Sequence, residues 1–296
     1  MTVDLVVATP TFLDLTFVGL EGLPGPGEER FAADLVRSPG GGAITAVGAA
    51  RLGLSTALAA PLGEDDAGDF VRTALEREGI RLGNRRSPRT PTTVVMPVDG
   101  DRSMVTVDPG VRASAADVAA LEPRAIALSL DQLYCVPEGA AAYVTCGDDD
   151  ARAFARRPPA QLSGARALFV SRREALTLTE APDVDSAAET LGRSAERVIV
   201  TLGGEGAMAL VEGRSMRAAA ISATALDTTG AGDLLVAAYI WADLRGASPE
   251  ECLQWAVIYA GLSIATPTGV GGAVGEGRLL EEGTQRGLTA PRSATA

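Results

Sequence analysis

Short apolar segments alternate with segments of helical character from residue 115 to residue 211, and this alternation restricts the fold more than any other feature. Some segments have the length and the aliphatic content of buried strands: 125–130, 141–145, 166–170, 197–202 and 207–211. Others are expected as helices: 115–121, 149–156, 172–179 and 186–194. Strands joined through helices run parallel and need helices on both faces. The pattern therefore predicts an α/β fold with a mainly parallel central sheet between helical layers.

The region before this alternation is expected to add a small flap to one main domain. Residues 92–98 and 103–107 are expected as two strands around the turn Asp99-Gly100-Asp101, which predicts a hairpin. Residues 16–37 include a segment rich in turn residues, and before them Asp14 follows a short loop. The chain shows no internal repeat, so we expect one domain with an early flap.

Charge and the choice of basic residues exclude several classes of protein. The formal net charge of −12 argues against nucleic acids and anionic membranes as partners, because both bind basic surfaces. The chain contains neither His nor Lys, so all 26 basic residues are Arg. This excludes Ser-His-Asp catalysis, His-based metal sites, Schiff-base chemistry and a phosphate-binding Lys. A phosphate would have to be held by Arg, backbone amides or a metal ion.

The cysteines and the hydropathy pattern indicate the cell compartment. Cys135, Cys146 and Cys252 lack metal-ligand spacing, so we expect free buried thiols in a reducing cytoplasm. The N-terminus has no basic segment followed by an apolar run, and no apolar stretch reaches the roughly 20 residues of a membrane span. We therefore expect a cytoplasmic protein without a membrane segment.

The segment DTTGAGD (227–233) runs directly into a long apolar helix expected at 232–245. Its small residues leave the backbone open, and the start of a helix presents free N–H groups and the positive end of the helix dipole. Together these features predict an anion site for phosphate oxygens that needs no Lys. Asp233 lies beside this site, where a carboxylate either caps the helix or takes the proton of an acceptor hydroxyl during phosphoryl transfer.

This segment resembles the second signature of the ribokinase-like (PfkB) family of carbohydrate and nucleoside kinases. Further segments resemble family motifs in the same order: GGGAITAVGAARLG (40–53), PLGEDDAGDFVRTALEREGI (61–80), SRREA (171–175) and TLGGEGA (201–207). The resemblance covers roughly residues 3–275. It implies a three-layer α/β/α sandwich with a small β lid, and ATP-dependent phosphorylation of a hydroxyl on a sugar or sugar derivative. It also implies that Asp233 is the general base.

The acceptor site that the resemblance implies includes Asp14, which matches the family's N-terminal Asp and accepts hydrogen bonds from substrate hydroxyls. The alternative for Asp14 is a loop Asp that caps a turn. Gly41 and Gly42 would let the sugar approach the backbone, and their alternative role is a glycine-rich helix entry. Members often carry an Asn near the helix start. A gap-free alignment places Ile44 at the position of this Asn. A shift by one residue places Thr45 there instead, which makes Thr45 a candidate substrate contact. The usual polar contact is therefore lost or altered.

The remaining implied roles concern the phosphates and their cations. The anion hole would consist of backbone amides: Gly230, Ala231 and Gly232. The nucleotide site would be lined by Ser171, which replaces the family's Asn, and by Thr201, Gly203 and Gly206. Glu174 would organise Mg²⁺ and its water molecules, and Asp227 would help to hold a monovalent cation such as K⁺. The alternatives are a helix first-turn acid for Glu174 and tight-turn glycines for the TLGGEG segment.

The lid that the resemblance implies spans about residues 11–37 and 90–108, within a kinase domain of residues 1–285. Residues 286–296 are expected as a disordered tail. Lids often pair between subunits in relatives, so we expect a homodimer. Arg102 lies at the lid hairpin within reach of an anionic substrate, but we expect a solvated turn Arg.

Two alternatives to a sugar kinase stay open. A nucleoside kinase of the same family would need an apolar or aromatic pocket for the base, and the chain has only six Phe, four Tyr and two Trp. A non-catalytic homologue would keep the fold and bind a sugar or a nucleotide without turnover. The intact GAGD segment argues against the second alternative.

Overall fold

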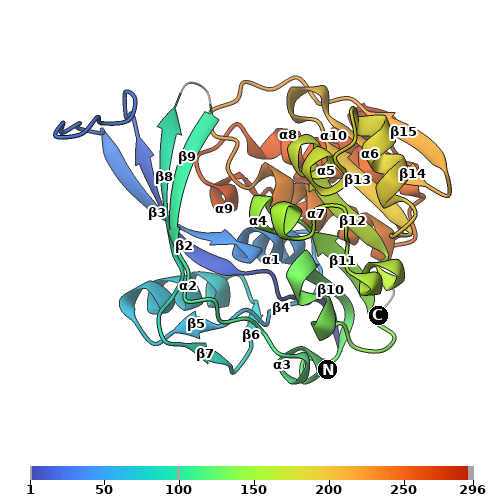
Figure 1. Cartoon of the computed structure of the whole chain (residues 1–296), viewed down its shortest axis with the longest axis horizontal. Coiled ribbons are helices and arrows are strands. Elements are labelled where there is room, and N and C mark those ends of the chain that lie inside the picture. The colour runs from blue at the N-terminus through green and yellow to red at the C-terminus, as the bar shows by residue number, and fades with distance from the viewer. Residues whose placement is uncertain (1, 99–100, 293–296) are drawn as a thin grey trace.

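The computed structural model describes residues 2–98 and 101–292, and its main element is a nine-stranded sheet (Figure 1). The strands follow one another across the sheet in the order β15 (Arg214–Ala218), β14 (Ala207–Val211), β13 (Arg197–Thr201), β12 (Ala167–Ser171), β11 (Ala141–Thr145), β10 (Pro123–Ser129), β1 (Val3–Val7), β4 (Thr56–Leu58) and β6 (Arg81–Leu82). All neighbours from β13 to β6 are parallel. At one edge of the sheet, β14 pairs antiparallel with both β13 and β15. The predicted mainly parallel sheet is confirmed.

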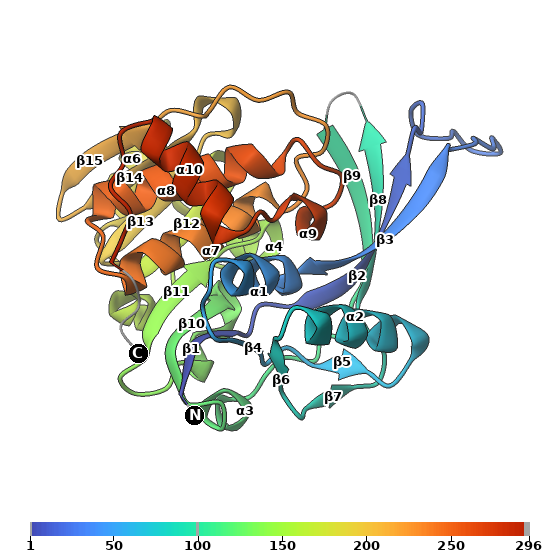
Figure 2. The same ribbon diagram turned by 180° about the vertical axis from the view of Figure 1, so that it is seen from behind.

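Helices cover both faces of this sheet (Figures 1 and 2). One face is covered by α1 (Gly42–Arg51), α2 (Asp66–Arg77), α7 (Ala231–Leu244), α8 (Pro249–Ser263) and α10 (Glu276–Gln285). The other face is covered by α3 (Ala115–Ala119), α4 (Asp148–Ala153), α5 (Arg172–Thr179) and α6 (Val184–Leu191). Successive strand residues alternate between the two cores, as Leu5 and Val6 of β1 do. None of the described helices is long and apolar enough to cross a membrane.

Helix α7 is buried from Leu234, directly after its open N-terminal residues, almost to its end. It packs against both α1 and α8, and residues 234–242 are all buried. The rings of Trp241 and Trp255 meet edge to face with their centroids 5.6 Å apart. Near its C-terminal end, Asp243 accepts a hydrogen bond of 2.8 Å from Nη1 of the buried Arg197. This packing gives the N-terminal end of α7 a fixed position above the sheet.

A second, four-stranded sheet forms the lid. Its strand order is β3 (Asp34–Gly41), β2 (Thr11–Val18), β8 (Thr92–Val98) and β9 (Asp101–Val107). Strands β8 and β9 confirm the predicted hairpin, and residues 99–100 of its turn lie outside the described residues. A further short pair, β5 (Leu62–Gly63) and β7 (Arg86–Ser87), forms a two-stranded parallel sheet.

The expectation of irregular structure around Asp14 and over residues 16–37 was partly wrong. Asp14 lies within β2, and residues 34–41 form β3 rather than a loop that opens the helix. Strand β2 pairs with β8, a segment much later in the chain, as well as with β3. Local composition does not reveal a pairing strand that is distant in the sequence. Without that strand, the polar residues of β2 are typical of a loop. Helix α10 ends at Gln285; the predicted domain bounds and the disorder of the tail stay predictions.

Candidate active site

A cavity of about 800 Å³ opens where the parallel strands β11, β12 and β13 end. Ligands of open α/β sheets bind at these carboxyl ends. Thr145, Ser171 and Thr201 end the three strands, and all three line the cavity. The cavity is also lined by Glu174, by Gly203 and Gly206 of the TLGGEG segment, and by Gly230, Ala231, Gly232 and Asp233 at the start of α7. The predicted nucleotide, anion-hole and catalytic residues therefore lie around one space.

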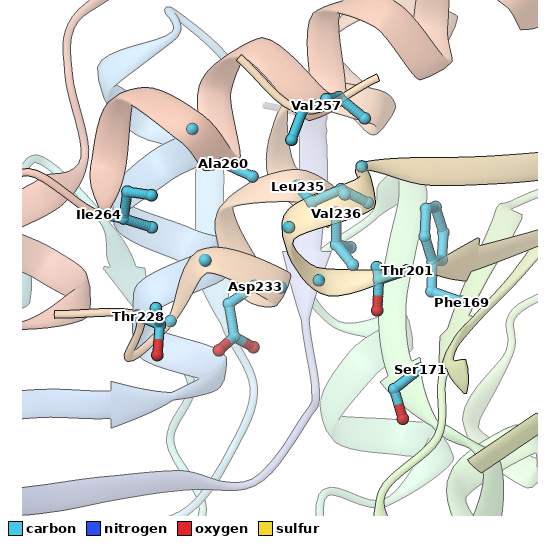
Figure 3. A pocket seen from close by; sticks show the side chains of 18 of the residues that line it. Phe169, Ser171, Thr201, Thr228, Asp233, Leu235, Val236, Val257, Ala260 and Ile264 are labelled. Carbon is cyan, nitrogen blue, oxygen red and sulfur yellow. The ribbon is translucent and has the colours of Figure 1, made fainter. Parts of the chain in front are cut away.

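The cavity has a polar region and an apolar one (Figure 3). The carboxylate of Asp233 points into it, and the side chains of Thr228 and Ser171 lie in the same region. The apolar lining comes from α7, α8 and the residue that follows α8: Leu235, Val236, Val257, Ala260 and Ile264. An elongated molecule with one charged end and one flat apolar end matches this division.

The predicted anion hole lies at the start of α7. First-turn amides of a helix have no carbonyl acceptor within the helix, and no side chain caps α7. The N–H of Ala231 donates to the carbonyl of Thr228 in the preceding loop at 3.3 Å. Gly230 has a left-handed φ of 77°, and a Cβ atom there would lie 2.8 Å from the Cα of Gly269 and 2.8 Å from the Cδ1 of Ile44. A Cβ atom at Gly232 would meet nothing within 4 Å. Gly230 thus fixes the loop, whereas Gly232 leaves room for an anion beside the helix.

Asp233 carries a carboxyl group whose pKa is raised from 3.8 to about 7. Burial is the main cause, and the negative charge of Asp14 adds to it. The charge of Arg102 and the hydroxyl of Thr45 act in the opposite direction. The Oγ1 atom of Thr45 donates to Asp233 Oδ1 across 3.5 Å. Thr45 is only 2% exposed, so the structure places this predicted substrate contact behind Asp233 rather than on the cavity surface.

Asp14 lies on the same side of the lid as a row of polar side chains. It pairs in register with Ser38 of β3 and with Thr93 of β8, and Thr93 pairs with Thr106 of β9. The hydroxyls of Thr93 and Thr106 are 3.0 Å apart. Asp14 is 8% exposed, and burial raises its pKa to about 6, with Arg102 opposing the shift. The negative charge of Asp227 adds to the rise in the pKa of Asp14, and the charge of Asp14 in turn adds to the rise in the pKa of Asp233.

The glycines before α1 fit closely against the chain itself. A Cβ atom on Gly41 would lie 2.5 Å from the carbonyl oxygen of Pro10, and one on Gly42 would lie 2.4 Å from that of Thr9. The close approach predicted for these two residues is thus made by the protein's own backbone. The glycine against the carboxylate of Asp14 is Gly40, where a Cβ atom would lie 2.0 Å from Oδ2.

Ile44 occupies the position at which the gap-free alignment placed it, near the start of α1. Its side chain is 2% exposed and fills the space between Gly230 and Gly269, a residue of the short helix α9 (Gly269–Gly272). It therefore supports the anion loop and offers no polar group to a substrate. The packing role of this position was not visible in the sequence, because Gly269 lies far along the chain.

The two candidate cation ligands both make hydrogen bonds with the backbone. Glu174 Oε2 accepts from the N–H of Ser171 at 2.6 Å, and Ser171 Oγ accepts from the N–H of Glu174, which closes a capping box at α5. Asp227 accepts from Thr229 and Thr268, each at 2.8 Å. Within residues 2–98 and 101–292, no group of three or more His, Cys, Asp or Glu side chains could hold a metal ion.

Arg102 lies in the site rather than in solvent at the hairpin turn. It lines the large cavity and also a second cavity of about 480 Å³ between the lid and the loops around Asp227 and Thr268. Its Nη1 atom donates to Thr228 Oγ1 at 3.0 Å. The expectation of a solvated Arg was therefore wrong. The alternation of β9 could have indicated this, because Arg102 and Thr106 lie on the same face of the strand.

Comparisons with known proteins agree with this geometry. A family model described as pfkB family carbohydrate kinase matches residues 17–271. An uncharacterized sugar kinase of Archaeoglobus fulgidus is 26% identical over 224 residues, which is 70% of this chain and 90% of that protein. The structure of Arabidopsis thaliana ribokinase complexed with ribose and ATP superposes with a TM-score of 0.80 at 25% identity, over 95% of this chain and 98% of that one. Ribokinase of Thermotoga maritima superposes with a TM-score of 0.81 at 20% identity, over 94% and 98%. The predicted ribokinase-like sandwich with its small β lid is confirmed.

Proposed function

Because this chain belongs to the PfkB family of carbohydrate kinases, we propose that it transfers the γ-phosphoryl group of ATP to a hydroxyl of a sugar or sugar derivative. One observation carries the proposal: the carboxylate of Asp233 points into the large cavity from the first turn of α7, beside the uncapped amides of that turn. Phosphoryl transfer needs a group that accepts the hydroxyl proton and donors for the phosphoryl oxygens. Asp233 and the backbone of Gly230, Ala231 and Gly232 supply both.

The nucleotide would occupy the large cavity, with its phosphates towards the start of α7. Ser171, Thr201, Gly203 and Gly206 would line the donor site, and the apolar end formed with α8 would take the base. The A. thaliana ribokinase structure, of the same fold, was determined with ATP. Mg²⁺ would neutralise charge on the phosphate oxygens, which are its usual partners in such sites, so a complete protein cage is not needed. Glu174 would hold water molecules of that ion, and Asp227 would contribute to a monovalent cation site such as one for K⁺.

The acceptor would lie between the lid and the start of α7. Asp14 would accept hydrogen bonds from its hydroxyls, and Asp233 would receive the proton of the reacting one. Gly41 and Gly42 would shape the corner at which the sugar meets the backbone. Thr45 would act by holding Asp233 in place, because its hydroxyl is directed at that residue.

An acceptor panel tests this proposal. Wild-type protein, ATP and Mg²⁺ are incubated with single candidates, including ribose, fructose, sugar acids, sugar phosphates and adenosine, and ADP is measured. We expect ADP only when an acceptor is present, and we expect a carbohydrate rather than a nucleoside to give it. Thermal stabilisation by a sugar without ADP formation would instead identify a non-catalytic binder.

The pH dependence of catalysis follows from the pKa of Asp233. A general base works in its ionised form, and this carboxyl group has a pKa of about 7, so the active fraction falls as the pH drops below 7. We expect kcat/KM to rise through neutral pH and to level off above it, with the rising limb centred near pH 7. A profile that is flat from acidic to alkaline pH would show that ionisation of this carboxyl group does not limit the reaction.

The outer face of the lid suggests a homodimer. Leu35, Val105 and Val107 lie on the lid face opposite Asp14 and are 47%, 60% and 55% exposed. Exposed aliphatic side chains on one face of a sheet are candidates for a contact surface, and we propose that the lid of a second copy covers them. Sedimentation of Val105→Glu beside the wild-type protein is the test: we expect a dimer for the wild type and a monomer for the variant.

A further inference from the structure

Arg102 occupies the border between the two cavities. Among the described residues that line either cavity, it is the only one with a basic side chain. The acidic side chains that line the two cavities are more numerous: Glu174, Asp227 and Asp233. A phosphate group that enters this space therefore meets mainly negative charge, and Arg102 is the cation placed to offset it.

The lid directs Arg102 towards the reaction centre. Arg102 and Thr106 lie on one face of β9, and Thr106 contacts Thr93, the register partner of Asp14. The Arg102 Nη1 atom donates to Thr228 Oγ1, two residues before the glycine that opens the anion site. Its positive charge lowers the pKa of both Asp14 and Asp233. Arg102 therefore acts electrostatically on two carboxylates, that of Asp14 in the lid strand β2 and that of Asp233 in α7.

We propose that Arg102 is a further catalytic residue, which binds oxygens of the phosphoryl group while that group is transferred. This inference rests on the proposed kinase function. During transfer, negative charge spreads over the equatorial oxygens of the phosphoryl group. Backbone amides offer only partial charges to these oxygens, and a chain without Lys or His has only Arg as a cationic side chain. A guanidinium group adds a full charge with N–H donors in a planar fork that fits two oxygens.

The step is balanced without any change in the protonation of Arg102. The acceptor oxygen forms a bond to the γ-phosphorus, and the bond from that phosphorus to the oxygen bridging it to the β-phosphate breaks. The acceptor proton goes to the Asp233 carboxylate, and ADP leaves with the bridging oxygen. Arg102 would stabilise the phosphoryl group in the transition state, so its contribution is expected mainly in kcat.

Replacement of Arg102 by Ala tests the proposal. With an acceptor identified from the panel, we expect kcat to fall by about 100-fold or more, as for loss of a transition-state donor or an arginine contact. Added guanidinium ion at millimolar concentration should restore part of the rate. The matched control is Arg30→Ala: Arg30 lies between β2 and β3, donates to the carbonyl of Glu21 and lines neither cavity. We expect this control to turn over like the wild type.

A binding measurement separates failure of this inference from failure of the proposed function. Wild-type and Arg102→Ala proteins are titrated with ADP alone and with ADP, Mg²⁺ and aluminium fluoride, which mimics the transferring phosphoryl group and needs no acceptor. We expect equal affinity for ADP and at least about 10-fold weaker binding of the aluminium fluoride complex by the variant. Equal binding of that complex by both proteins would overturn the inference even if the wild type proves to be a kinase. A rise confined to the KM of a phosphorylated or carboxylated acceptor would also overturn it, because Arg102 would then bind the acceptor's own anion.

Discussion

Replacing Asp233 with Asn is expected to lower kcat by about 10²–10⁴-fold while the affinity for ATP stays near the wild-type value. The amide has nearly the shape of the carboxylate but cannot accept the proton of the acceptor hydroxyl. The backbone amides at the start of α7 are unchanged in this variant, so the proposed phosphate site is preserved. The measurement is steady-state kinetics at about pH 8, where most of the wild-type carboxylate is ionised, together with titration of ATP.

The same variant should remain fully folded. The folded-state pKa of Asp233 lies above its ordinary value of 3.8, so above about pH 7 the ionised group makes the folded protein less stable. Asn carries no charge and removes that effect, and the melting temperature at pH 8 should equal or exceed that of the wild type. Asp66→Asn is the matched control, because Asp66 is an exposed acid in the first turn of α2 and lines no described cavity. If Asp233→Asn turned over like the wild type, Asp233 would not be the general base.

Replacing Gly230 with Ala is expected to lower kcat by about 10²–10³-fold, the range for loss of an oxyanion-hole donor. The left-handed φ of 77° disfavours any residue with a Cβ atom, by about 1–2 kcal/mol. The new methyl group would also lie 2.8 Å from Gly269 and from Ile44, so the loop before α7 has to shift. A shift of this loop moves the amides that would hold the phosphoryl oxygens. The measurements are kcat and the free energy of unfolding of the variant.

The opposite end of the same helix provides the control. Gly246 has a φ of 76°, but a Cβ atom there would meet nothing within 4 Å. Gly246→Ala therefore imposes a similar backbone strain without a steric clash and far from the cavity. We expect it to lower stability by about 1–2 kcal/mol with turnover unchanged. Similar kcat values for the two variants would mean that the geometry of the anion loop does not limit the reaction.

The parts of the fold that the sequence predicted are those whose pattern is local. The strands from 125 to 211 are buried on both faces, so each forms a continuous apolar run that is visible in the sequence. Helix α7 was predicted from an apolar run that follows two glycines. Strands β2 and β3 were missed because Asp14, Thr16 and the glycines of β3 are residue types common in loops. Only in the assembled lid do these residues lie in paired strands. Their hydrogen-bond partners come from distant segments.

The candidate site shows the same division. Gly230, Gly232 and Asp233 lie in one short segment, and their shared location followed from the sequence. The position of Arg102 did not, because it depends on the register of β9 against β8 and on the packing of the lid beside Thr228. The hydroxyl of Thr45 and the side chain of Ile44 face Asp233 and Gly230, respectively, through the packing of α1 on α7. Such contacts between helices leave no mark in a single sequence.

Transfer of a labelled phosphoryl group tests the central claim most directly. ATP labelled with ³²P in the γ position is incubated with the acceptor panel and either wild-type protein or Asp233→Asn, and carbohydrate esters are separated from inorganic phosphate. We predict that the wild type places the label in one carbohydrate ester and that the variant leaves it almost entirely in ATP. Label that appears only in inorganic phosphate for every acceptor, or equal ester formation by both proteins, would contradict the account.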